Sequence, residues 1–452
     1  MRALPYALTI FLLSGIPARG QDKFASDRPI EDRVRELEEA VQRLGQAPPA
    51  AAPAIPFLAG WDEKTGFALR SADDRFLLRI TGQIQADYRY YADEADTTDI
   101  PTFLVRRARL GIESTVLRYY EFRLLPDFGQ GQARIQDAYL NVHYWDALQF
   151  EAGKFKQPFS YEQLIQDRFV PTLERSLIDQ LVPARDVGLM GHGQNLLDGR
   201  LDYGASVYGG VINGDADTDR NKEVAGRIAA RPLRDFGLPD WAAAIQLGIA
   251  GTYGEDRGVL GPTVLRTPAG VPWLQFAADV RPDGLRTRCS PELVYVYGPA
   301  ALAAQYFAED QELRRPPGPV VAVSYRGGYV LATCLLTGEE RTSLSQPIAP
   351  LLAFDPVDGC FGPGAWELVA RVSWLEVDAD DRRGFAQLLD PARAATRATE
   401  VTTGFNWYWN RWVRMQLNWE HARFNKSVRL GTGPGGRRDH QNTLLARFQV
   451  IF

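Results

Sequence analysis

The stretch LRITGQIQADYRY, residues 78–90, alternates apolar or small side chains with polar ones along its whole length. Successive side chains of a β-strand point to opposite faces, so the alternation predicts a ribbon with one apolar and one polar face. The stretch LLARFQVIF, residues 444–452, follows the same rule, with Arg447 and Gln449 on its polar face. A long series of such ribbons is typical of a barrel that faces lipid outside and water inside.

Further ribbons of this kind recur between those two, separated by turn signals that contain Gly and Pro. They lie near 103–113, 119–127, 135–144, 148–156, 185–193, 200–212, 222–232, 242–253, 285–297, 300–310, 319–336, 365–377, 398–410 and 413–420. The total is roughly sixteen, an even number as bacterial barrels favour, and 271–281 is an ambiguous seventeenth. Long connections are expected near 157–184, 255–283 and 337–363.

The first twenty residues have the features of a secretory signal peptide. Arg2 precedes an apolar core at 4–13, and Ala18-Arg19-Gly20 is a small-x-small cleavage site. An anchor helix is the weaker interpretation, because the apolar core is too short to span a bilayer. No later run reaches about 18 apolar residues, so a membrane-spanning chain would have to cross with strands that close on themselves. The sequence therefore predicts an all-β, 16-stranded antiparallel transmembrane barrel in the outer membrane.

A short helix is predicted at 27–45, ahead of the barrel. Ile30, Val34, Leu37, Val41 and Leu44 follow a four-three heptad spacing, which favours a coiled coil. Two heptads are too few for an isolated helix, so it needs partner helices, most simply copies of itself. A lone amphipathic helix lying on the barrel is the alternative. A Pro/Ala-rich linker at 46–60 and a barrel domain at 61–452 complete the predicted organisation.

Composition and motifs argue against several functions. The 452 residues carry 51 Lys and Arg against 56 Asp and Glu, a net charge of -5, which disfavours nucleic acid as a partner. Three widely spaced cysteines, Cys289, Cys334 and Cys360, make neither a disulfide framework nor a zinc ribbon. The four His have no HExxH context, and no G-x-S-x-G elbow occurs. No catalytic site, cofactor or metal is therefore expected.

The chain from about 75 to 452 resembles the phosphate-selective porin O and P family in a series of ordered motifs. They are Val105-Arg106-Arg107-Ala108-Arg109-Leu110-Gly111-Ile112-Glu113, Asp127-Phe128-Gly129, Gln136-Asp137-Ala138-Tyr139-Leu140, Gly153-Lys154-Phe155-Lys156-Gln157-Pro158-Phe159, Glu174-Arg175-Ser176-Leu177, Leu181-Val182-Pro183-Ala184-Arg185-Asp186-Val187-Gly188, Leu336-Thr337-Gly338-Glu339 and Gly404-Phe405-Asn406-Trp407-Tyr408. The resemblance implies a sixteen-stranded homotrimeric porin that passes small solutes passively, phosphate among them. The heptad segment is where the chain departs from the family's pattern.

Strand parity supplies candidate pore charges. If Leu104 and Ala108 face lipid, then Arg107 and Arg109 face the lumen, and Arg106 belongs on the lipid side near an interface. The full set of basic candidates for an anion-attracting constriction is Arg107, Arg109, Arg123, Lys154, Lys156, Arg168, Arg175 and Arg185. For each one singly, a wall charge paired with a carboxylate is the competing interpretation.

Three functions remain open at this point. The first is a porin for small solutes, with a preference for anions. The second is a structural barrel with little conductance, whose coiled coil ties the membrane to the cell wall; the heptad segment motivates it. The third is a soluble, secreted, β-rich binding protein. Lipid and small anionic solutes are the partners expected under the first.

Overall fold

The computed structural model of the protein describes residues 57–62, 66–92, 101–357, 359–430 and 436–452, and a few isolated positions between 29 and 42. Residues 31, 32, 34, 35, 38, 39 and 42 are helical. The predicted signal peptide at 1–20, the rest of the predicted coiled coil at 27–45 and most of the linker at 46–60 lie outside the described residues. The chain divides into two compact units, 1–55 and 56–452. Within the described part, no helix is long and apolar enough to cross a bilayer.

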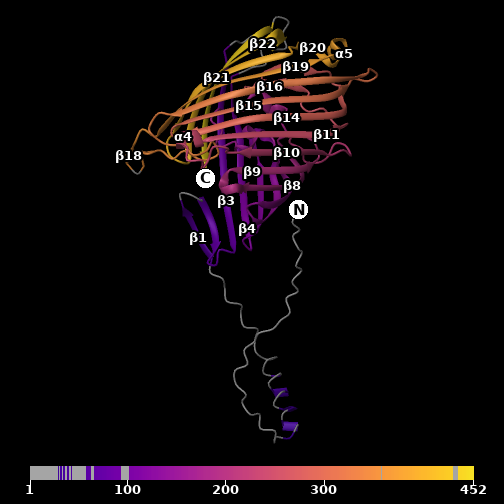
Figure 1. Ribbon diagram of the computed structural model, residues 1–452. Coiled ribbons are helices and arrows are strands. Elements are labelled where there is room, and N and C mark those ends of the chain that lie inside the picture. Colours follow the sequence, from indigo (N-terminus) through magenta and orange to yellow (C-terminus); the bar gives the residue numbers. More distant parts are fainter. Residues whose placement is uncertain are drawn as a thin grey trace. The chain divides into compact units, whose positions relative to one another are not determined.

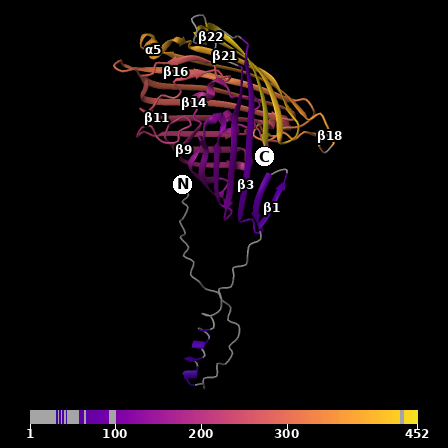
Figure 2. The same cartoon turned by 180° about the vertical axis from the view of Figure 1, so that it is seen from behind.

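The second unit is one antiparallel sheet that closes on itself (Figures 1 and 2). Its closed part consists of β3 (Phe76–Tyr91), β4 (Thr102–Val116), β5 (Tyr120–Asp127), β6 (Arg134–Trp145), β7 (Leu148–Lys156), β8 (Arg185–Asn195), β9 (Leu201–Tyr208), β10 (Glu223–Ala230), β11 (Ile245–Asp256), β14 (Arg281–Tyr297), β15 (Ala300–Arg314), β16 (Val320–Leu335), β19 (Ala365–Ala379), β21 (Arg397–Tyr408), β22 (Val413–Arg429) and β23 (Arg437–Ile451). The predicted sixteen-stranded antiparallel barrel is confirmed.

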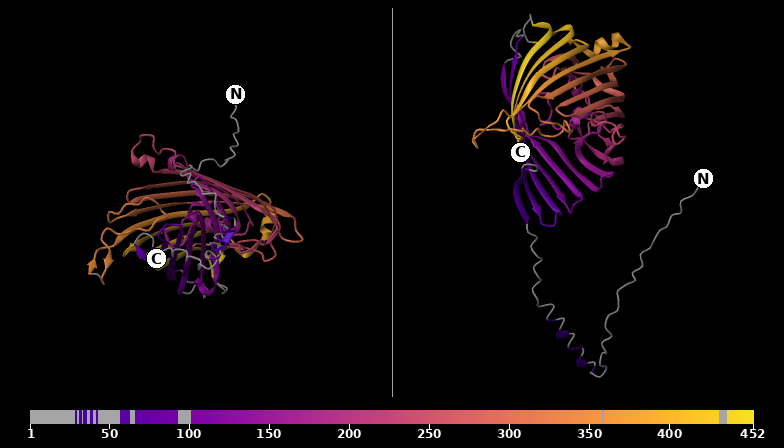
Figure 3. Two further views of the ribbon diagram at one scale, coloured as in Figure 1. Left: turned by 90° about the horizontal axis from the view of Figure 1, so that it is seen from below. Right: turned by 60° about the vertical axis from the view of Figure 1, so that its left-hand side comes forward.

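The barrel closes where its first and last strands meet. β23 pairs with β3 from Thr443 opposite Tyr91 to Ile451 opposite Gln83. Beyond that point the backbone of Phe452 exchanges hydrogen bonds of 2.9 and 3.0 Å with Gly82. Figure 3 shows the indigo strands of the start and the yellow strands of the end running side by side. Every barrel strand therefore has a neighbour on both sides, which leaves no open border in the closed part.

The chain enters this barrel through a hairpin. β1 (Phe57–Asp62) pairs with β2 (Gly66–Ser71), and β2 pairs with β3 only from Leu77 to Ile80. This part of β3 extends past the end of β23, so β2 takes the place of β23 there.

We call the rim that carries Phe452 and the connections 117–119 and 298–299 the C-terminal rim, and the opposite one the loop rim.

The remaining short elements lie in the connections. In the connections that start from the loop rim they are η1 (Gly129–Gly131), α2 (Tyr161–Leu164), η2 (Leu177–Gln180), α5 (Arg382–Leu388) and a small sheet of β12 (Val264–Arg266), β13 (Pro272–Phe276) and β20 (Leu389–Ala394). At the C-terminal rim they are α3 (Leu196–Gly199), α4 (Asp240–Ala243), β17 (Phe354–Asp355) and β18 (Cys360–Phe361). The only strand that lies wholly within the ambiguous ribbon at 271–281 is β13, which pairs within a loop and is not a wall strand, while Arg281 begins β14.

Side-chain parity in β4 agrees with the sequence at Arg107 and Arg109 but not at the start of the strand. Arg107 and Arg109 face inward as predicted and are buried. The prediction that Arg106 and Leu104 face outward is wrong. Gln85 pairs with Arg107 while Ala86 pairs with Val105, so Arg106 is the extra residue of a β-bulge. A bulge shifts parity by one, and so both Arg106 and Arg107 point into the barrel.

Close contact between β6 and β7 depends on a glycine, which gives a first prediction. Gly153 has φ of +126°, and a Cβ there would lie 2.3 Å from the Ala138 carbonyl oxygen. We expect Gly153→Ala to lower the free energy of unfolding by about 1–3 kcal/mol, because backbone cannot move aside cheaply. Gly226→Ala in β10 is the control, since nothing lies within 4 Å of its Cβ position. Denaturant titration in lipid vesicles measures both, and equal stability would contradict the assignment.

Candidate functional site

The long connection between β7 and β8, residues 157–184, folds into the lumen and has an apolar side. That side is buried against inward-facing residues of β15, β16 and β19, and it consists of Phe159, Ile165, Val170, Leu173, Leu177, Ile178, Leu181 and Val182. The ring of Phe159, for example, meets that of Phe307 edge-on at 6.2 Å. We call residues 157–184 the lumen loop. Because its apolar side is covered by the wall, the lumen loop narrows the barrel from one side.

The lumen loop also satisfies its backbone polar groups against the wall. Asn406 and Gln416 donate to the Pro171 carbonyl at 2.9 and 3.0 Å, and the Leu173 amide donates to Asn418 at 2.8 Å. A loop buried without such partners would leave backbone amide and carbonyl groups unpaired, which costs free energy. These bonds hold the middle of the lumen loop in a defined position.

The opposite, charged side of the lumen loop faces β3 and β4. Glu174 accepts hydrogen bonds from Arg106 (2.7 and 3.0 Å), Arg89 (2.7 Å) and Arg447 (3.1 Å). Burial alone would raise the pKa of Glu174, but the guanidinium groups of Arg106, Arg107, Arg447 and Arg89 hold that pKa well below its usual range. Glu174 is therefore an ionised hub that joins the lumen loop to three strands.

Asp167 is a second hub of the same kind. It pairs with Arg175 at 2.6 Å, with Arg107 at 3.3 Å, and with Arg109, which also binds Asp127 at 2.7 Å. Burial opposes ionisation of Asp167, yet Arg175, Arg107 and Arg109 keep its pKa well below the ordinary aspartate value. The arginines that sequence singled out at the constriction thus bind the loop's own carboxylates.

The other predicted basic residues are engaged as well. Arg123 pairs with Glu113 (3.3 Å) and Asp137 (3.2 Å), and Arg185 pairs with Asp137 at 2.6 Å. Lys154 pairs with Asp215, and Lys156 donates to the carbonyls of residues 163–165 at the end of α2. Seven of the eight candidates therefore have a charged or carbonyl partner inside the protein.

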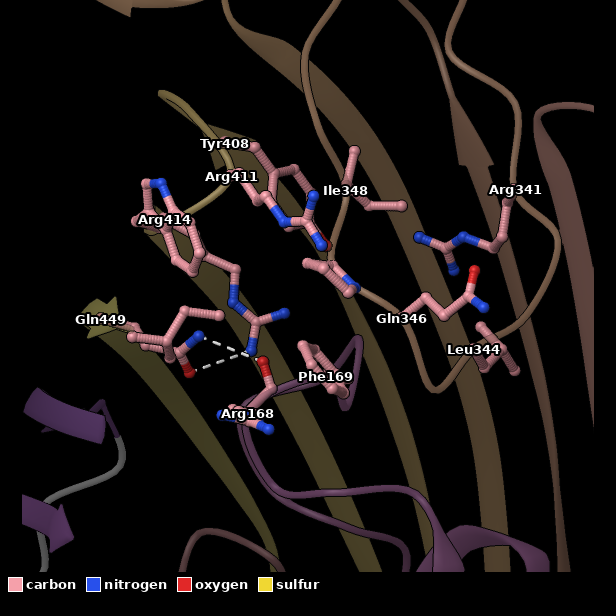
Figure 4. Close-up of a pocket in the computed structure, with 13 residues that line it drawn as sticks. Arg168, Phe169, Arg341, Leu344, Gln346, Ile348, Tyr408, Arg411, Arg414 and Gln449 are labelled. Atoms are coloured by element: carbon pink, nitrogen blue, oxygen red, sulfur yellow. Dashed lines mark hydrogen bonds between the residues drawn. The ribbon is translucent and has the colours of Figure 1, made fainter. Parts of the chain in front are cut away.

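Arg168 is the exception, and it lies at the tip of the lumen loop in a recess near the C-terminal rim (Figure 4). The recess is lined by Arg168, Phe169, Arg341, Leu344, Gln346, Pro347, Ile348, Tyr408, Arg411, Trp412, Arg414, Gln449 and Ile451. No carboxylate is among these residues. Arg414 donates to Gln449 at 3.2 Å and lies over the Tyr408 ring, and Gln449 donates to the Arg168 carbonyl at 3.1 Å.

Three guanidinium groups in this recess have no ion-pair partner among the described residues: those of Arg168, Arg411 and Arg414. We call them the arginine triad. Arg168 and Arg411 lie over the aromatic rings of their own neighbours, Phe169 and Trp412. The fourth arginine of the recess, Arg341, pairs with Glu367 at 2.6 Å.

The recess exists because the C-terminal rim has a long connection. Residues 336–364 join β16 to β19, and Leu344 and Ile348 of this segment are buried against the strand ends. The segment and the lumen loop thus enter the barrel from opposite ends and meet around Arg168. The adjoining recess, lined among others by Arg109, Asp167 and Arg185, also includes Arg168, so this side chain stands between two spaces of the lumen.

Sequence reasoning missed two members of the triad. Alternation in 413–420 places Arg414 on the polar face, so that residue carried a usable signal. Arg411 lies in the turn between β21 and β22, where alternation says nothing about direction. No group of three or more His, Cys, Asp or Glu side chains suited to a metal is found in the described part of the chain.

Comparison with known proteins agrees with this architecture. The family model "Phosphate-selective porin O and P" matches residues 78–239 and 274–452. This is more than half of the chain, and the protein therefore belongs to that family, whose members are channels of the outer membrane. No curated sequence matches.

Solved structures share the fold at low sequence identity. The outer membrane channel DcaP of Acinetobacter baumannii has a TM-score of 0.53 and 11% identity over 87% of this chain and 100% of its own. OmpT, an outer membrane protein of Vibrio cholerae, gives 0.52 and 12% over 84% and 98%. An anion-selective porin from Comamonas acidovorans gives 0.51 and 10% over 83% and 100%. Fold and family are those of a channel rather than of an enzyme.

The Glu174 hub gives a second prediction. We expect Glu174→Gln to lower the free energy of unfolding by about 3–5 kcal/mol, because buried arginines lose their counter-charge. Glu255→Gln, which removes an exposed partner of Arg257, should cost about 0–1 kcal/mol. Denaturant titration in lipid compares the two, and similar losses would contradict the hub.

The ionised carboxylate of Glu174 also makes the free energy of unfolding depend on pH. A carboxylate whose folded pKa is depressed contributes stability that is complete above its unfolded pKa, about 4.3 for glutamate, and is lost as the pH falls toward the folded value. The unfolding titration of the unsubstituted protein should therefore weaken below about pH 4, and Glu174→Gln should flatten that part of the curve. An unchanged curve would show that Glu174 is not ionised.

Proposed function

We propose that this member of the phosphate-selective porin O and P family forms a water-filled channel for passive diffusion of small solutes, and that the channel prefers anions. The observation that carries the preference is the arginine triad, Arg168, Arg411 and Arg414, in a recess without carboxylates. Phosphate is within the class of anions that such a group would attract.

The pairing of charges along the lumen supports the arginine triad as the selective element. Arg107, Arg109 and Arg175 pair with Asp167 and Asp127, and Arg175 also lies 3.7 Å from Asp179, so much of their field at a passing ion is offset. No described carboxylate lies within ion-pair distance of the triad, and in a low-dielectric wall such a positive group attracts anions and repels cations. Selectivity is therefore assigned to the triad and not to the arginines of the constriction as a whole.

The protonation state of Arg168 fits this role. Burial lowers the pKa of its guanidinium to about 10, still well above neutral pH. Arg168 thus keeps its charge under ordinary conditions. Since it lines two adjoining recesses, an anion that moves from one to the other passes this side chain.

The triad gives a third prediction, read in planar bilayers. Replacing Arg168, Arg411 and Arg414 by Gln together should lower the anion-to-cation permeability ratio about threefold or more, since three positive groups without an ion-pair partner among the described residues are lost from the lumen. The control is Arg315→Gln, which removes a half-exposed arginine of the loop rim that pairs with Asp279. Reversal potentials across a salt gradient measure the ratio.

Two results would count against the proposal. An unchanged reversal potential in the triple variant, with normal conductance, would place selectivity elsewhere. Absence of conductance in the unsubstituted protein would favour the structural barrel that ties the membrane to the wall.

We further infer that the mature chain begins after Gly20 and forms homotrimers, with residues 27–45 as a three-stranded coiled coil. The heptad spacing of Ile30, Val34, Leu37, Val41 and Leu44 supports the inference, as does the need of so short a helix for partners.

Deletion of residues 27–44 gives the fourth prediction. The barrel should still insert, because the sheet closes without these residues, while trimers dissociate at a lower detergent concentration or temperature. Light scattering in detergent measures the mass of the complex. A deletion variant that stays fully trimeric, or that fails to insert, would show that the segment has another role.

A further inference from the structure

A two-stranded hairpin, β17–β18, projects sideways from the C-terminal rim. It lies within the long connection 336–364, with Phe354 opposite Phe361. In Figures 1, 2 and 3 it extends beyond the outline of the wall next to the ends of β21 and β22. Neither the closure of the barrel nor the recess at Arg168 uses this hairpin, so its position needs another explanation.

The hairpin is fixed to a band of aromatic side chains on the outward face of the wall. We call this band the aromatic belt; it consists of Trp366, Phe405, Trp407, Trp409 and Phe448, which contact one another at centroid distances of 5.3–5.7 Å. The Phe354 ring lies 5.4 Å from both Trp407 and Trp409, and the Phe354 amide donates to the Trp409 carbonyl at 2.7 Å.

A second set of bonds fixes the return strand. The indole nitrogens of Trp366 and Trp407 both donate to the Pro363 carbonyl, at 3.0 and 2.9 Å. The Gly364 amide donates to the Leu352 carbonyl at 3.0 Å. The hairpin is therefore held in a set direction from the aromatic belt, and both of its ends are tied down.

Its free surface is apolar. Val357 is 92% exposed and Phe361 75% exposed, and Leu351 and Leu352 at its base are exposed as well. Large apolar side chains that gather on one projecting element mark an interaction surface. The same surface continues along the outward face of the wall through Leu368 and Phe405, which is the face that meets lipid in a membrane barrel.

We propose that the β17–β18 hairpin lies in the headgroup boundary of the lipid leaflet at the C-terminal rim and is a lipid-contacting arm of the barrel. Tryptophan and tyrosine belts mark that boundary, because amphipathic rings fit between hydrocarbon and water. Asp355 in the hairpin and Asp358 in its sequence suit the boundary and not the hydrocarbon. A lipid layer fits better than a second copy of the chain, because a hairpin whose two strands have two residues each offers far less area than a stable protein interface.

The inference rests on the placement of the barrel in a membrane and not on the anion preference. Spin labels test it in the Cys289→Ser, Cys334→Ser, Cys360→Ser background, with Val357→Cys as the reporter. Val259→Cys is the matched control, because Val259 is 72% exposed in a connection of the loop rim. Accessibility to oxygen and to a water-soluble nickel chelate is measured for both labels in phospholipid vesicles.

We expect the oxygen-to-nickel accessibility ratio at residue 357 to be about threefold higher than at 259, since oxygen concentrates in the apolar part of a bilayer. Phe361→Cys is a second reporter in case one label disturbs the fold, and conductance of the labelled protein shows that the channel is intact. Equal ratios at 357 and 259 would overturn the proposal. Low accessibility to both agents, with dipolar coupling between labels, would also overturn it and identify a protein contact. A negative result in the selectivity test at the arginine triad would leave the outcome of this experiment unaffected.

Discussion

Backbone hydrogen bonding in a medium without water is the constraint on which this structure depends. A strand border left open in lipid would expose unpaired amide and carbonyl groups, each at a cost of several kcal/mol. The chain meets this constraint at one seam, where β23 pairs with β3 and the Phe452 backbone pairs with Gly82. Because β3 and β23 pair in a staggered register, the seam leaves the first part of β3 without β23 as a neighbour, and β2 pairs with residues 77–80 there. The hairpin before the barrel is thus a consequence of this stagger.

Closure creates a second requirement, since the inward faces carry many charged groups, and those that are buried need counter-charges. The lumen loop answers it with an amphipathic section. Its apolar side packs on the wall formed by β15, β16 and β19, while Asp167 and Glu174 on the other side meet the arginines of β3, β4 and β23. Removal of either carboxylate would leave buried guanidinium groups without a counter-charge, which is costly. The loop and the wall therefore specify each other.

Alternation in the sequence predicted the wall well, because parity depends only on local geometry. It failed at Arg106, where a bulge opposite Gln85 and Ala86 reversed the parity. A bulge is a property of two paired strands and leaves no mark in one of them. The sequence also could not predict which arginines pair with carboxylates. Asp167 lies 60 positions from Arg107 in sequence, and only the path of the lumen loop brings the two together. The same holds for Arg411, whose turn gives no period to follow.

The distinction between paired and unpaired arginines has a physical meaning for transport. A buried guanidinium without a carboxylate is kept in place only if other contacts support it, and here aromatic rings and amide oxygens do so: Phe169 for Arg168, Trp412 for Arg411, and Gln449 with Tyr408 for Arg414. Such contacts stabilise a cation without cancelling its charge. The protein therefore holds three positive groups in place without a carboxylate among the residues that line their recess. Under the proposed anion preference, a carboxylate in the same recess would improve the local pairing and remove the attraction for a passing anion.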